Sequence, residues 1–257
     1  KTDPRGKQNC PTMGAMIEVM DTNLGRLLDK LAVLGIEEDT LIVFTADNGG
    51  NMYNQVEGTT PTNNAPLRSG KGNAYEGGCR VPLIVSWPGT VAPGTDTKTI
   101  ASTVDWFPTL LDLLRLEPPA GQPIDGASLL PVLRGGSLER DTIFCHFPHY
   151  VKATDNLPCT WVRRGDWKLL RFFCDNEDQS DRLELYNLRE DIGESNNLAG
   201  EMPDLARELN ALITTHLAAT AALVPQRNPR FGKQPPAGWE VSGDTILAAT
   251  DGKLVVT

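Results

Sequence analysis

The sequence predicts an α/β fold class, in which part of a mixed or parallel sheet with flanking helices is followed by a small antiparallel sheet and one helix. Two observations predict the first part. Apolar residues recur at helical spacing over residues 13–31, and an unbroken apolar run, Leu41 to Ala46, follows them. A third observation predicts the second part: beyond about residue 140 the pattern changes to short strand-like runs and a closing amphipathic stretch.

The first predicted element is a helix that opens at Pro11-Thr12 and ends at Gly35. Its apolar stripe consists of Met13, Met16, Ile17, Met20, Leu24, Leu27, Leu28 and Leu31. Such a stripe normally faces a core, so we expect the methionines to be packing residues rather than metal ligands. A helix followed by a strand is the unit from which parallel sheets are built.

The apolar run 41–46 stops at Asp47-Asn48-Gly49-Gly50. A strand that is apolar on both faces is typical of a sheet covered by helices on both sides, and in such sheets ligands gather at the carboxyl ends of the strands. Carboxylate and amide oxygens suit a hard cation such as Ca²⁺. An Asx turn that only caps the strand explains the same residues, because Asn/Asp-Gly is common turn chemistry.

Three motifs follow one another in this part of the chain. They are Asp-Asn-Gly at 47–49, Pro-Leu-Arg-Ser-Gly-Lys-Gly at 66–72, and Tyr-Glu-Gly-Gly-Cys-Arg-Val-Pro at 75–82, which runs into a strand-like segment ending Trp-Pro-Gly at 87–89. In this order the motifs resemble the type I sulfatases, which belong to the alkaline-phosphatase-like superfamily. The resemblance extends from about Met13 to about Phe231 and implies an alkaline-phosphatase-like sheet.

The resemblance implies a sulfuric ester hydrolase, a sulfatase or arylsulfatase that cleaves a sulfate monoester with Ca²⁺ and a formylglycine nucleophile. Asp47 and Asn48 match metal ligands of the family, and Lys71 matches its catalytic, sulfate-binding lysine. An ammonium group is a compact charge that suits a sulfate oxygen; without the motif, Lys71 would read as an exposed loop lysine. Arg68 is a candidate substrate-binding residue that also suits a structural role. The expected substrate is a sulfated small molecule or glycan.

The nucleophile of the family has no counterpart in this chain. The family forms formylglycine within a Cys/Ser-x-Pro-x-Arg motif, whereas Cys79 and Cys145 have their proline at the wrong spacing and Ser86 lacks the arginine. The early metal-binding aspartates of the family are also missing. We therefore expect the C-terminal part of a sulfatase, inactive alone, whose partner is the N-terminal part of the same protein or another copy of this chain. Ligands from the missing part would complete the calcium site.

The next predicted elements lie between residues 83 and 136. Leu83 to Trp87 indicates a second buried strand, and Asp105 is placed to cap a helix that continues to Arg115. A short helix is expected within residues 125–136, where paired glycines end it.

The second part is predicted to contain four strands and a helix. Gly165-Asp166 is a hairpin signal, and Pro203 opens a helix that continues to about Ala219. The strand-like runs cover residues 142–147, 160–163, 167–173 and 183–188. Residues 246–257 indicate a further hairpin on an Asp-Gly turn. The expected domains are 1–139 (part of the catalytic α/β domain), 140–224 (the antiparallel-sheet subdomain) and 225–257 (a Pro/Gly-rich tail and hairpin).

His146 and His149 lie three residues apart at the end of the run 142–147. Two histidines at this spacing can bind a metal, but no third His or Cys is placed to complete a zinc site. The other interpretations are contact with the substrate at the rim of a cleft, and a packed histidine beside a surface histidine. His216, on the last helix, is expected to be structural.

Composition and charge limit the alternatives. The 257 residues are 40% hydrophobic and 22% charged, as in ordinary globular proteins. A net charge of −9 argues against a nucleic-acid or anionic-membrane partner. Within the given residues we expect no segment that spans a bilayer and recognise no signal-peptide pattern, which says nothing about export if an N-terminal part precedes them. The resemblance nevertheless implies a full-length protein that is exported to a periplasm, the extracellular space or a lysosome.

Five cysteines make an odd count, so at least one stays outside any disulfide of the chain. Cys159 and Cys174 flank a predicted hairpin, and either a disulfide between them or buried thiols would fit.

Two other functions remain open from sequence. One is a phosphomonoesterase or phosphodiesterase of the same superfamily, although Asn after Asp and only three histidines argue against a two-zinc site. The other is a non-catalytic binding module derived from a sulfatase.

Overall fold

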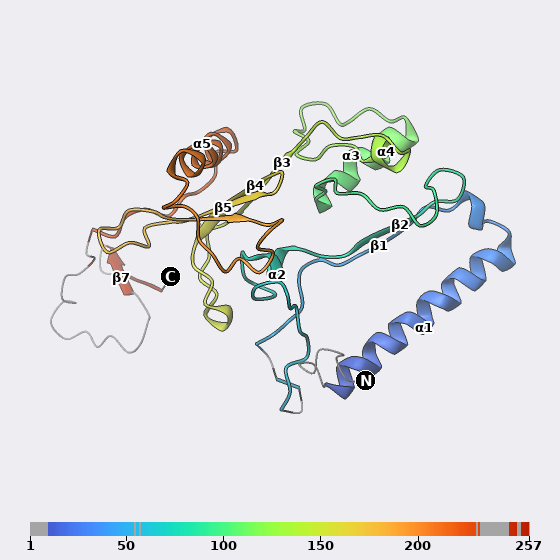
Figure 1. The fold of residues 1–257 in the computed structure, drawn as a ribbon, viewed down its shortest axis with the longest axis horizontal. Helices are drawn as coiled ribbons and strands as arrows, with labels where there is room; N and C mark the ends of the chain where they lie inside the picture. Colours follow the sequence, from blue (N-terminus) through green and yellow to red (C-terminus); the bar gives the residue numbers. More distant parts are fainter. Residues whose placement is uncertain are drawn as a thin grey trace. The chain divides into compact units, whose positions relative to one another are not determined.

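The computed structural model describes residues 10–53, 55–56, 58–229 and 231, and the backbone of two strands further along (Figure 1). Contacts divide the chain into two units, Lys1–Pro225 and Gln226–Thr257. In the second unit, β7 (Leu247–Thr250) and β8 (Lys253–Val256) pair antiparallel, as predicted for a hairpin. The Asp-Gly turn expected between them lies outside the described residues.

Helix α1 (Pro11–Leu34) has the predicted bounds. It ends at Gly35, whose φ of 65° is left-handed, and the amide of Gly35 donates to the Ala32 carbonyl oxygen at 3.0 Å. A short 3₁₀ turn, η1 (Glu37–Asp39), then leads into the first strand.

Strands β1 (Ile42–Thr45) and β2 (Leu83–Ser86) pair antiparallel, with Ile42 opposite Ser86 and Thr45 opposite Leu83. The sequence predicted that both strands, and the stripe of α1, would be buried. For this chain that prediction is wrong: Ile84 is 60% exposed, Leu83 is 40% exposed, and no residue of α1 is buried. The reason is that no third strand pairs with β1 or β2 among the described residues.

The segment between the two strands includes α2 (Glu76–Cys79), a single helical turn that follows the long polar loop. After β2 the chain forms η2 (Thr103–Asp105), α3 (Trp106–Leu114) and α4 (Leu130–Leu133).

The sequence predicted that the side chain of Asp105 caps α3. In the structure the Asp105 side chain makes no capping hydrogen bond to α3. Its Oδ2 instead accepts the amide of Ser102 at 2.7 Å and caps the preceding turn η2. The fully buried carboxylate also accepts the amide of Ala127 at 2.9 Å and pairs with Arg140. Asp105 thus fixes three chain segments, and Arg140, Ala127 and Ser102 hold the pKa of its carboxyl below the usual range although burial opposes them.

The second part of the first unit is a four-stranded antiparallel sheet in the order β3-β4-β5-β6. All four strands have the predicted positions, with shifts of only one residue at some ends. They are β3 (Thr142–Phe147), β4 (Cys159–Arg164), β5 (Trp167–Phe172) and β6 (Arg182–Asn187). Side chains alternate between the two faces of such a sheet, and each face packs against a different partner.

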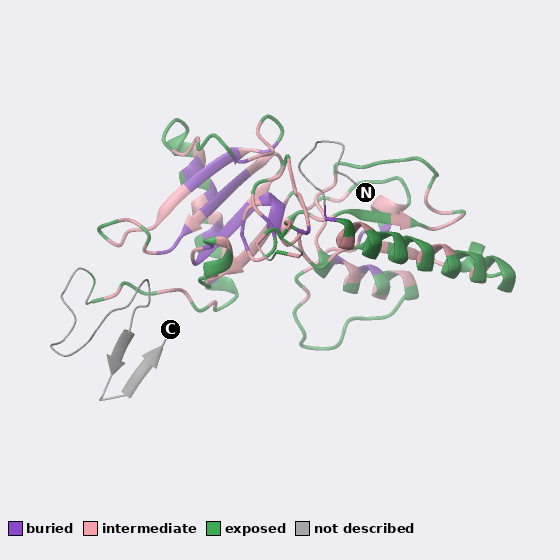
Figure 2. Cartoon of the chain, turned by 90° about the horizontal axis from the view of Figure 1, so that it is seen from below, coloured by how far each residue is buried: buried purple, intermediate pink, exposed green. Residues whose placement is uncertain are grey.

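One face of the sheet packs against α5 (Pro203–Ala219). Its core combines Val162, Leu169 and Leu185 of the strands with Leu209 and Ile213 of the helix. Figure 1 shows α5 beside this sheet, and Figure 2 shows that buried residues are concentrated in the sheet while α1 is largely exposed.

The other face of the sheet packs against the segment that begins α2. Its core contains Trp161, Leu170, Phe172 and Tyr186 of the strands together with Ala74. The antiparallel sheet is therefore a platform on which the motif-bearing loop before β2 rests.

The chain has no disulfide. Cys10, Cys79, Cys145, Cys159 and Cys174 are all thiols, so the alternative of a bond between Cys159 and Cys174 is not realised. Among the described residues, no helix is both long enough and apolar enough to cross a membrane.

We expect residues 1–257, expressed alone, to self-associate. The α1 stripe is uncovered at Ile17 and Leu27, and the strand pair is uncovered at Ile84; contiguous apolar patches of this kind promote association. Light scattering after gel filtration should give masses above 28.0 kDa that rise with concentration. A double variant, Leu27→Lys with Ile84→Lys, should lower that mass.

The matched control is Leu223→Lys, at an isolated side chain that is 88% exposed. This control should leave the mass unchanged. A monomer of the unaltered chain at all concentrations would contradict the expectation.

Candidate functional site

Asp47 and Asn48 form a bend directly after β1. The Asn48 amide donates to Oδ1 of Asp47 at 3.0 Å, and Nδ2 of Asn48 donates to the Gly49 carbonyl oxygen at 2.9 Å. These bonds occupy one carboxylate oxygen of an exposed Asp47 and the amide nitrogen of Asn48. Both residues keep an oxygen without a hydrogen bond among the described residues.

Backbone hydrogen bonds bring Lys71 beside this bend, although it lies far along the sequence. The amide of Lys71 donates to the Gly50 carbonyl oxygen at 3.0 Å, and the amide of Gly49 donates to the Gly78 carbonyl oxygen at 2.9 Å. A Cβ on Gly49 would lie 1.7 Å from the Gly77 carbonyl oxygen, so only glycine fits there. The structure therefore places the Asp47-Asn48 bend and Lys71 on adjacent, joined segments.

Asn64 provides a second connection between the same segments. Its Oδ1 accepts the amide of Gly50 at 3.2 Å, while its Nδ2 donates to the carbonyl oxygens of Gly50 at 2.9 Å and Ser69 at 3.0 Å. Because these bonds fix the backbone, the exposed Lys71 side chain is the part of the loop that stays available to a ligand.

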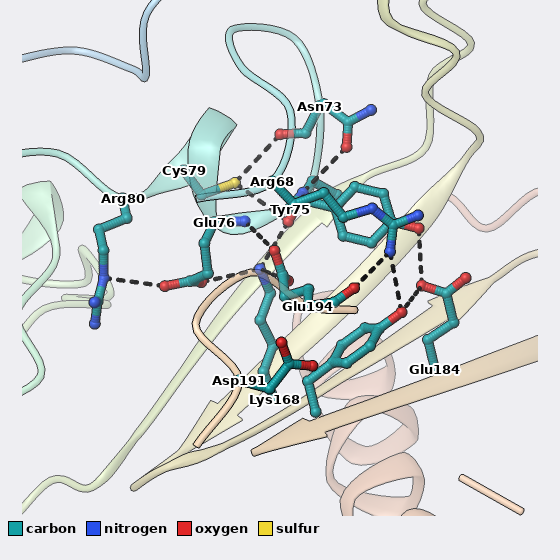
Figure 3. A network of polar contacts seen from close by, with 12 residues as sticks. Arg68, Asn73, Tyr75, Glu76, Cys79, Arg80, Lys168, Glu184, Asp191 and Glu194 are labelled. Carbon is teal, nitrogen blue, oxygen red and sulfur yellow. Dashed lines mark hydrogen bonds and ion pairs between the residues drawn. The ribbon is translucent and has the colours of Figure 1, made fainter. Parts of the chain in front are cut away.

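Arg68 belongs to a polar network that links its loop to the antiparallel sheet (Figure 3). Its guanidinium lies 3.6 Å from the centroid of the Tyr75 ring, and NH1 donates to the Tyr186 hydroxyl at 3.1 Å and to the Glu194 carbonyl oxygen at 2.9 Å. These contacts support the structural interpretation of Arg68.

Lys168 forms a buried ion cluster with Glu76 and Glu194 (Figure 3). Its Nζ lies 3.0 Å from Oε1 of Glu76 and 2.9 Å from Oε1 of Glu194, and it donates to the Ala74 carbonyl oxygen at 2.9 Å. Lys168 and Glu194 are fully buried. Glu194 Oε2 also accepts the amide of Glu76 at 2.6 Å, and Arg80 pairs with Glu76 from the exposed side at 3.0 Å. The cluster thus ties α2 to the sheet.

The pKa values within the cluster follow from burial and charge. Burial works to lower the pKa of Lys168, but the carboxylates of Glu76 and Glu194 outweigh it and raise that pKa, so the ammonium stays charged. Burial raises the pKa of Glu194, although the charge of Lys168 opposes the rise.

Beside the cluster, Glu184 accepts hydrogen bonds from two phenols. The hydroxyls of Tyr75 and Tyr186 donate to its Oε2 at 2.8 Å and 2.9 Å. Burial and the charge of Glu184 raise the pKa of both phenols. The two tyrosines are therefore neutral donors, and they link the start of α2 to strand β6.

The histidines are separated by the fold. The ring of His146 hydrogen-bonds Thr160 Oγ1 at 2.7 Å through Nδ1 and the Leu223 carbonyl oxygen at 2.9 Å through Nε2. His149 is exposed and packs edge-on against Phe147. His216 stacks on Phe144 with ring centroids 4.2 Å apart, in line with a structural role; burial lowers its pKa. Of the first two, only His149 is therefore available to a substrate.

The thiols of the core are not nucleophiles. Burial raises the pKa of Cys79 and of Cys159 to about 12 in each case, which keeps both protonated at neutral pH.

The described residues contain no group of three or more His, Cys, Asp or Glu side chains that suits a metal ion. Asp47 and Asn48 therefore fit part of a hard-cation site, with two or three of the six to eight oxygens that Ca²⁺ takes.

Residues 1–116 match the family described as Sulfatase, and residues 70–220 match the family described as N-sulphoglucosamine sulphohydrolase, C-terminal. The chain belongs to the sulfatase family. It is 39% identical over 229 residues to a sulfatase of Formosa agariphila, an alignment that covers 81% of this chain and 39% of the relative. It is 33% identical over 251 residues to arylsulfatase A of Homo sapiens. That alignment covers 86% of this chain and 46% of the relative.

Solved structures give the same result for the fold. One protein, solved in complex with its substrate D-glucosamine-2-N,6-O-disulfate, is 29% identical with a TM-score of 0.64, over 79% of this chain and 39% of that chain. Another, solved in complex with k-i-k-neocarrahexaose, is 26% identical with a TM-score of 0.66. The match covers 78% of this chain and 41% of that chain. The α/β class of the alkaline-phosphatase-like type is confirmed.

A third similar structure is the phosphonate monoester hydrolase of Agrobacterium radiobacter, 29% identical with a TM-score of 0.59 over 80% of this chain and 40% of that chain. In all of these alignments this chain spans less than half the length of the protein to which it is compared.

Sequence reasoning missed Lys168 and Glu194. Lys168 lies within a strand-like run, where a lysine is ordinarily expected to face solvent. Its signal was the strict alternation of the strand, which places it on the same face as Leu170 and therefore in a core.

We expect Lys168→Met to lower the free energy of unfolding of the full-length protein by about 3–5 kcal/mol, because it leaves two buried carboxylates without their shared cation. The loss should shrink between about pH 7 and about pH 5. A buried carboxylate without a cation has a raised pKa in the folded state, so proton uptake favours the folded state as pH falls. Urea unfolding at several pH values measures both effects.

The control for this variant is Arg207→Met, which removes an exposed ion pair to Asp204. Exposed pairs contribute little, so its stability should equal that of the unaltered protein within error. Equal stability of Lys168→Met would contradict the assigned role of the cluster.

Proposed function

We propose that the full-length protein carrying this chain is a sulfuric ester hydrolase that acts on a sulfate monoester. The observation that supports this most is the pair of backbone hydrogen bonds that set Lys71 beside the Asp47-Asn48 bend. These bonds join the segments that carry an exposed cation and two candidate oxygen ligands, the groups that the proposed reaction would use. Membership of the sulfatase family supports the same reaction.

In this proposal the residues have separate roles. Asp47 and Asn48 hold Ca²⁺ with ligands supplied from outside this chain, and Asp47 gives most of the affinity because it is charged. Bound there, Ca²⁺ would polarise sulfate oxygens and lower the pKa of the nucleophile. Lys71 holds a sulfate oxygen that gains negative charge in the transition state. The formylglycine nucleophile lies outside this chain, so residues 1–257 alone are inactive.

The proposed substrate is a sulfated glycan or a sulfated small molecule. Relatives named arylsulfatase A and N-acetylgalactosamine-6-sulfatase, and a neighbour solved with D-glucosamine-2-N,6-O-disulfate, support this range. We also propose that the full-length protein is exported, and that residues 1–139, 140–224 and 225–257 are its C-terminal divisions.

A phosphonate or phosphate ester hydrolase is the second candidate. The similarity to the phosphonate monoester hydrolase of Agrobacterium radiobacter favours it, since that protein is as identical to this chain as the neighbour solved with a sulfated glucosamine. Rates of the full-length protein on matched aryl sulfate, phosphate and phosphonate esters separate the candidates. The sulfate ester should give the highest kcat/KM, and a faster phosphonate reaction would reverse the assignment.

Replacing Lys71 by Ala in the full-length protein should lower kcat/KM for an aryl sulfate by roughly 10²-fold or more, the scale of losing one electrostatic stabiliser. Steady-state kinetics measures this. Lys98→Ala, at another exposed loop lysine, is the control and should react normally. Near-normal turnover of Lys71→Ala would make Lys71 an ordinary surface lysine.

Calorimetry should show that this chain alone binds Ca²⁺ more weakly than micromolar, because two residues supply too few oxygens. In the full-length protein, Asp47→Asn should weaken calcium binding, since it removes the one charged ligand of this pair. Micromolar binding by the isolated chain would mean that a fuller set of ligands has been overlooked.

A further inference from the structure

The loop between β3 and β4 lies directly against the segment that carries Lys71. It runs from residue 148 to residue 158 and includes the 3₁₀ turn η3 (Lys152–Thr154). A Cβ built on Gly72 would lie 3.4 Å from Cγ1 of Val151 and 3.7 Å from Cγ2 of Thr154. Val151 is therefore packed next to the residue that follows Lys71.

Three hydrogen bonds hold this loop in place. Thr154 Oγ1 donates to the Gly72 carbonyl oxygen at 2.9 Å, and Nδ2 of Asn73 donates to the Thr154 carbonyl oxygen at 2.9 Å. The amide of Ala74 donates to Oδ1 of the buried Asn156 at 3.0 Å. The bonds run in both directions between the two segments, so their relative position is fixed.

The loop also stabilises its own shape. Val151 and Asn156 form an isolated antiparallel bridge, and Nδ2 of Asn156 donates to the carbonyl oxygens of His149 at 3.1 Å and Leu157 at 2.9 Å. Side chains on its outer side are thus presented from a rigid frame, which is the arrangement that recognition loops use.

Two side chains on this frame have no structural role in the described chain. Tyr150 is 70% exposed, more than any other aromatic residue that the structure describes, and Lys152 is also exposed. Neither side chain has a hydrogen-bond or ion-pair partner among the described residues. They flank Val151, so both lie one residue from the contact with Gly72.

We propose that Tyr150 and Lys152 are substrate-specificity residues, which contact the part of a sulfated saccharide next to the sulfate ester held by Lys71. The proposal rests on the sulfatase function proposed above. Tyr150 offers an amphipathic ring for packing against the apolar face of a sugar, and Lys152 offers a point charge for a second anionic group on the same or the adjoining sugar.

Kinetics with two classes of substrate tests the proposal. In the full-length protein, Tyr150→Ala should lower kcat/KM for a sulfated disaccharide roughly 5- to 10-fold, mainly through KM, because one ring contact is lost. It should leave kcat/KM for 4-nitrophenyl sulfate unchanged, since that ester has no sugar. Tyr150→Phe keeps the ring and should restore most of the disaccharide activity. An equal loss on both substrates, or no loss on either, would overturn the assignment.

Lys152→Ala is tested on three disaccharides, whose second anionic group is a sulfate ester, a uronate carboxylate or absent. The variant should lower kcat/KM about 3- to 5-fold only where a second anionic group is present, and the first two substrates show which group Lys152 prefers. An equal effect on the uncharged substrate would contradict the role of Lys152.

Equilibrium binding separates this proposal from the proposed function. If the full-length protein hydrolyses none of the esters, calorimetry with the same disaccharides still compares the unaltered protein with Tyr150→Ala. Weaker binding by the variant supports the contact even though the reaction assignment fails. Equal binding, or no binding by the unaltered protein, would overturn the contact. Unchanged melting temperatures of the variants show that the fold is intact.

Discussion

The buried Lys168 ammonium is the interaction on which the arrangement of this chain depends. It contacts Glu76 and the Ala74 carbonyl oxygen on one side and Glu194 on the other, so a single charge joins the motif-bearing loop, strand β5 and the turn after β6. A buried cation between two carboxylates is stable only when all three are fixed, because each group without its partners would be strongly destabilising in the interior. The cluster therefore favours one relative position of the loop and the sheet.

That position explains why the two faces of the four-stranded sheet differ. Leu169 points to the α5 face and joins an entirely apolar core, whereas its neighbours Lys168 and Leu170 point to the opposite face. There the partner is an irregular segment whose backbone carbonyls and amides need hydrogen bonds. Lys168 donates to the Ala74 carbonyl oxygen, and Glu194 accepts the amide of Glu76. The sheet thus stabilises the loop that carries Lys71 without contributing any atom to the proposed sulfate site.

Sequence alone predicted the antiparallel sheet and α5 almost residue by residue, because alternation and helical spacing are local signals. It also selected Asp47 and Asn48 from their place after an apolar strand, and Lys71 through a resemblance. The joining of their segments depends on hydrogen bonds between Gly49, Gly50 and residues far along the chain. The ion cluster was missed: alternation along β5 places Lys168 on the same face as Leu170, but no local pattern marks Glu194 as its buried partner. The expected burial of β1, β2 and the α1 stripe failed for a different reason. Their apolar patterns are those of a larger core than the described residues assemble.

Burial separates two sets of charged groups that matter for the proposed site. Lys168, Glu194 and Asp105 are fully buried and paired, so their charges are already neutralised within the fold. Asp47 and Lys71 are exposed on a backbone that is held in place by hydrogen bonds. A ligand can be recognised only by charges that the protein has not already neutralised. The buried pairs therefore fix the geometry, while the exposed charges of Asp47 and Lys71 remain available to the Ca²⁺ ion and the sulfate group of the proposed function.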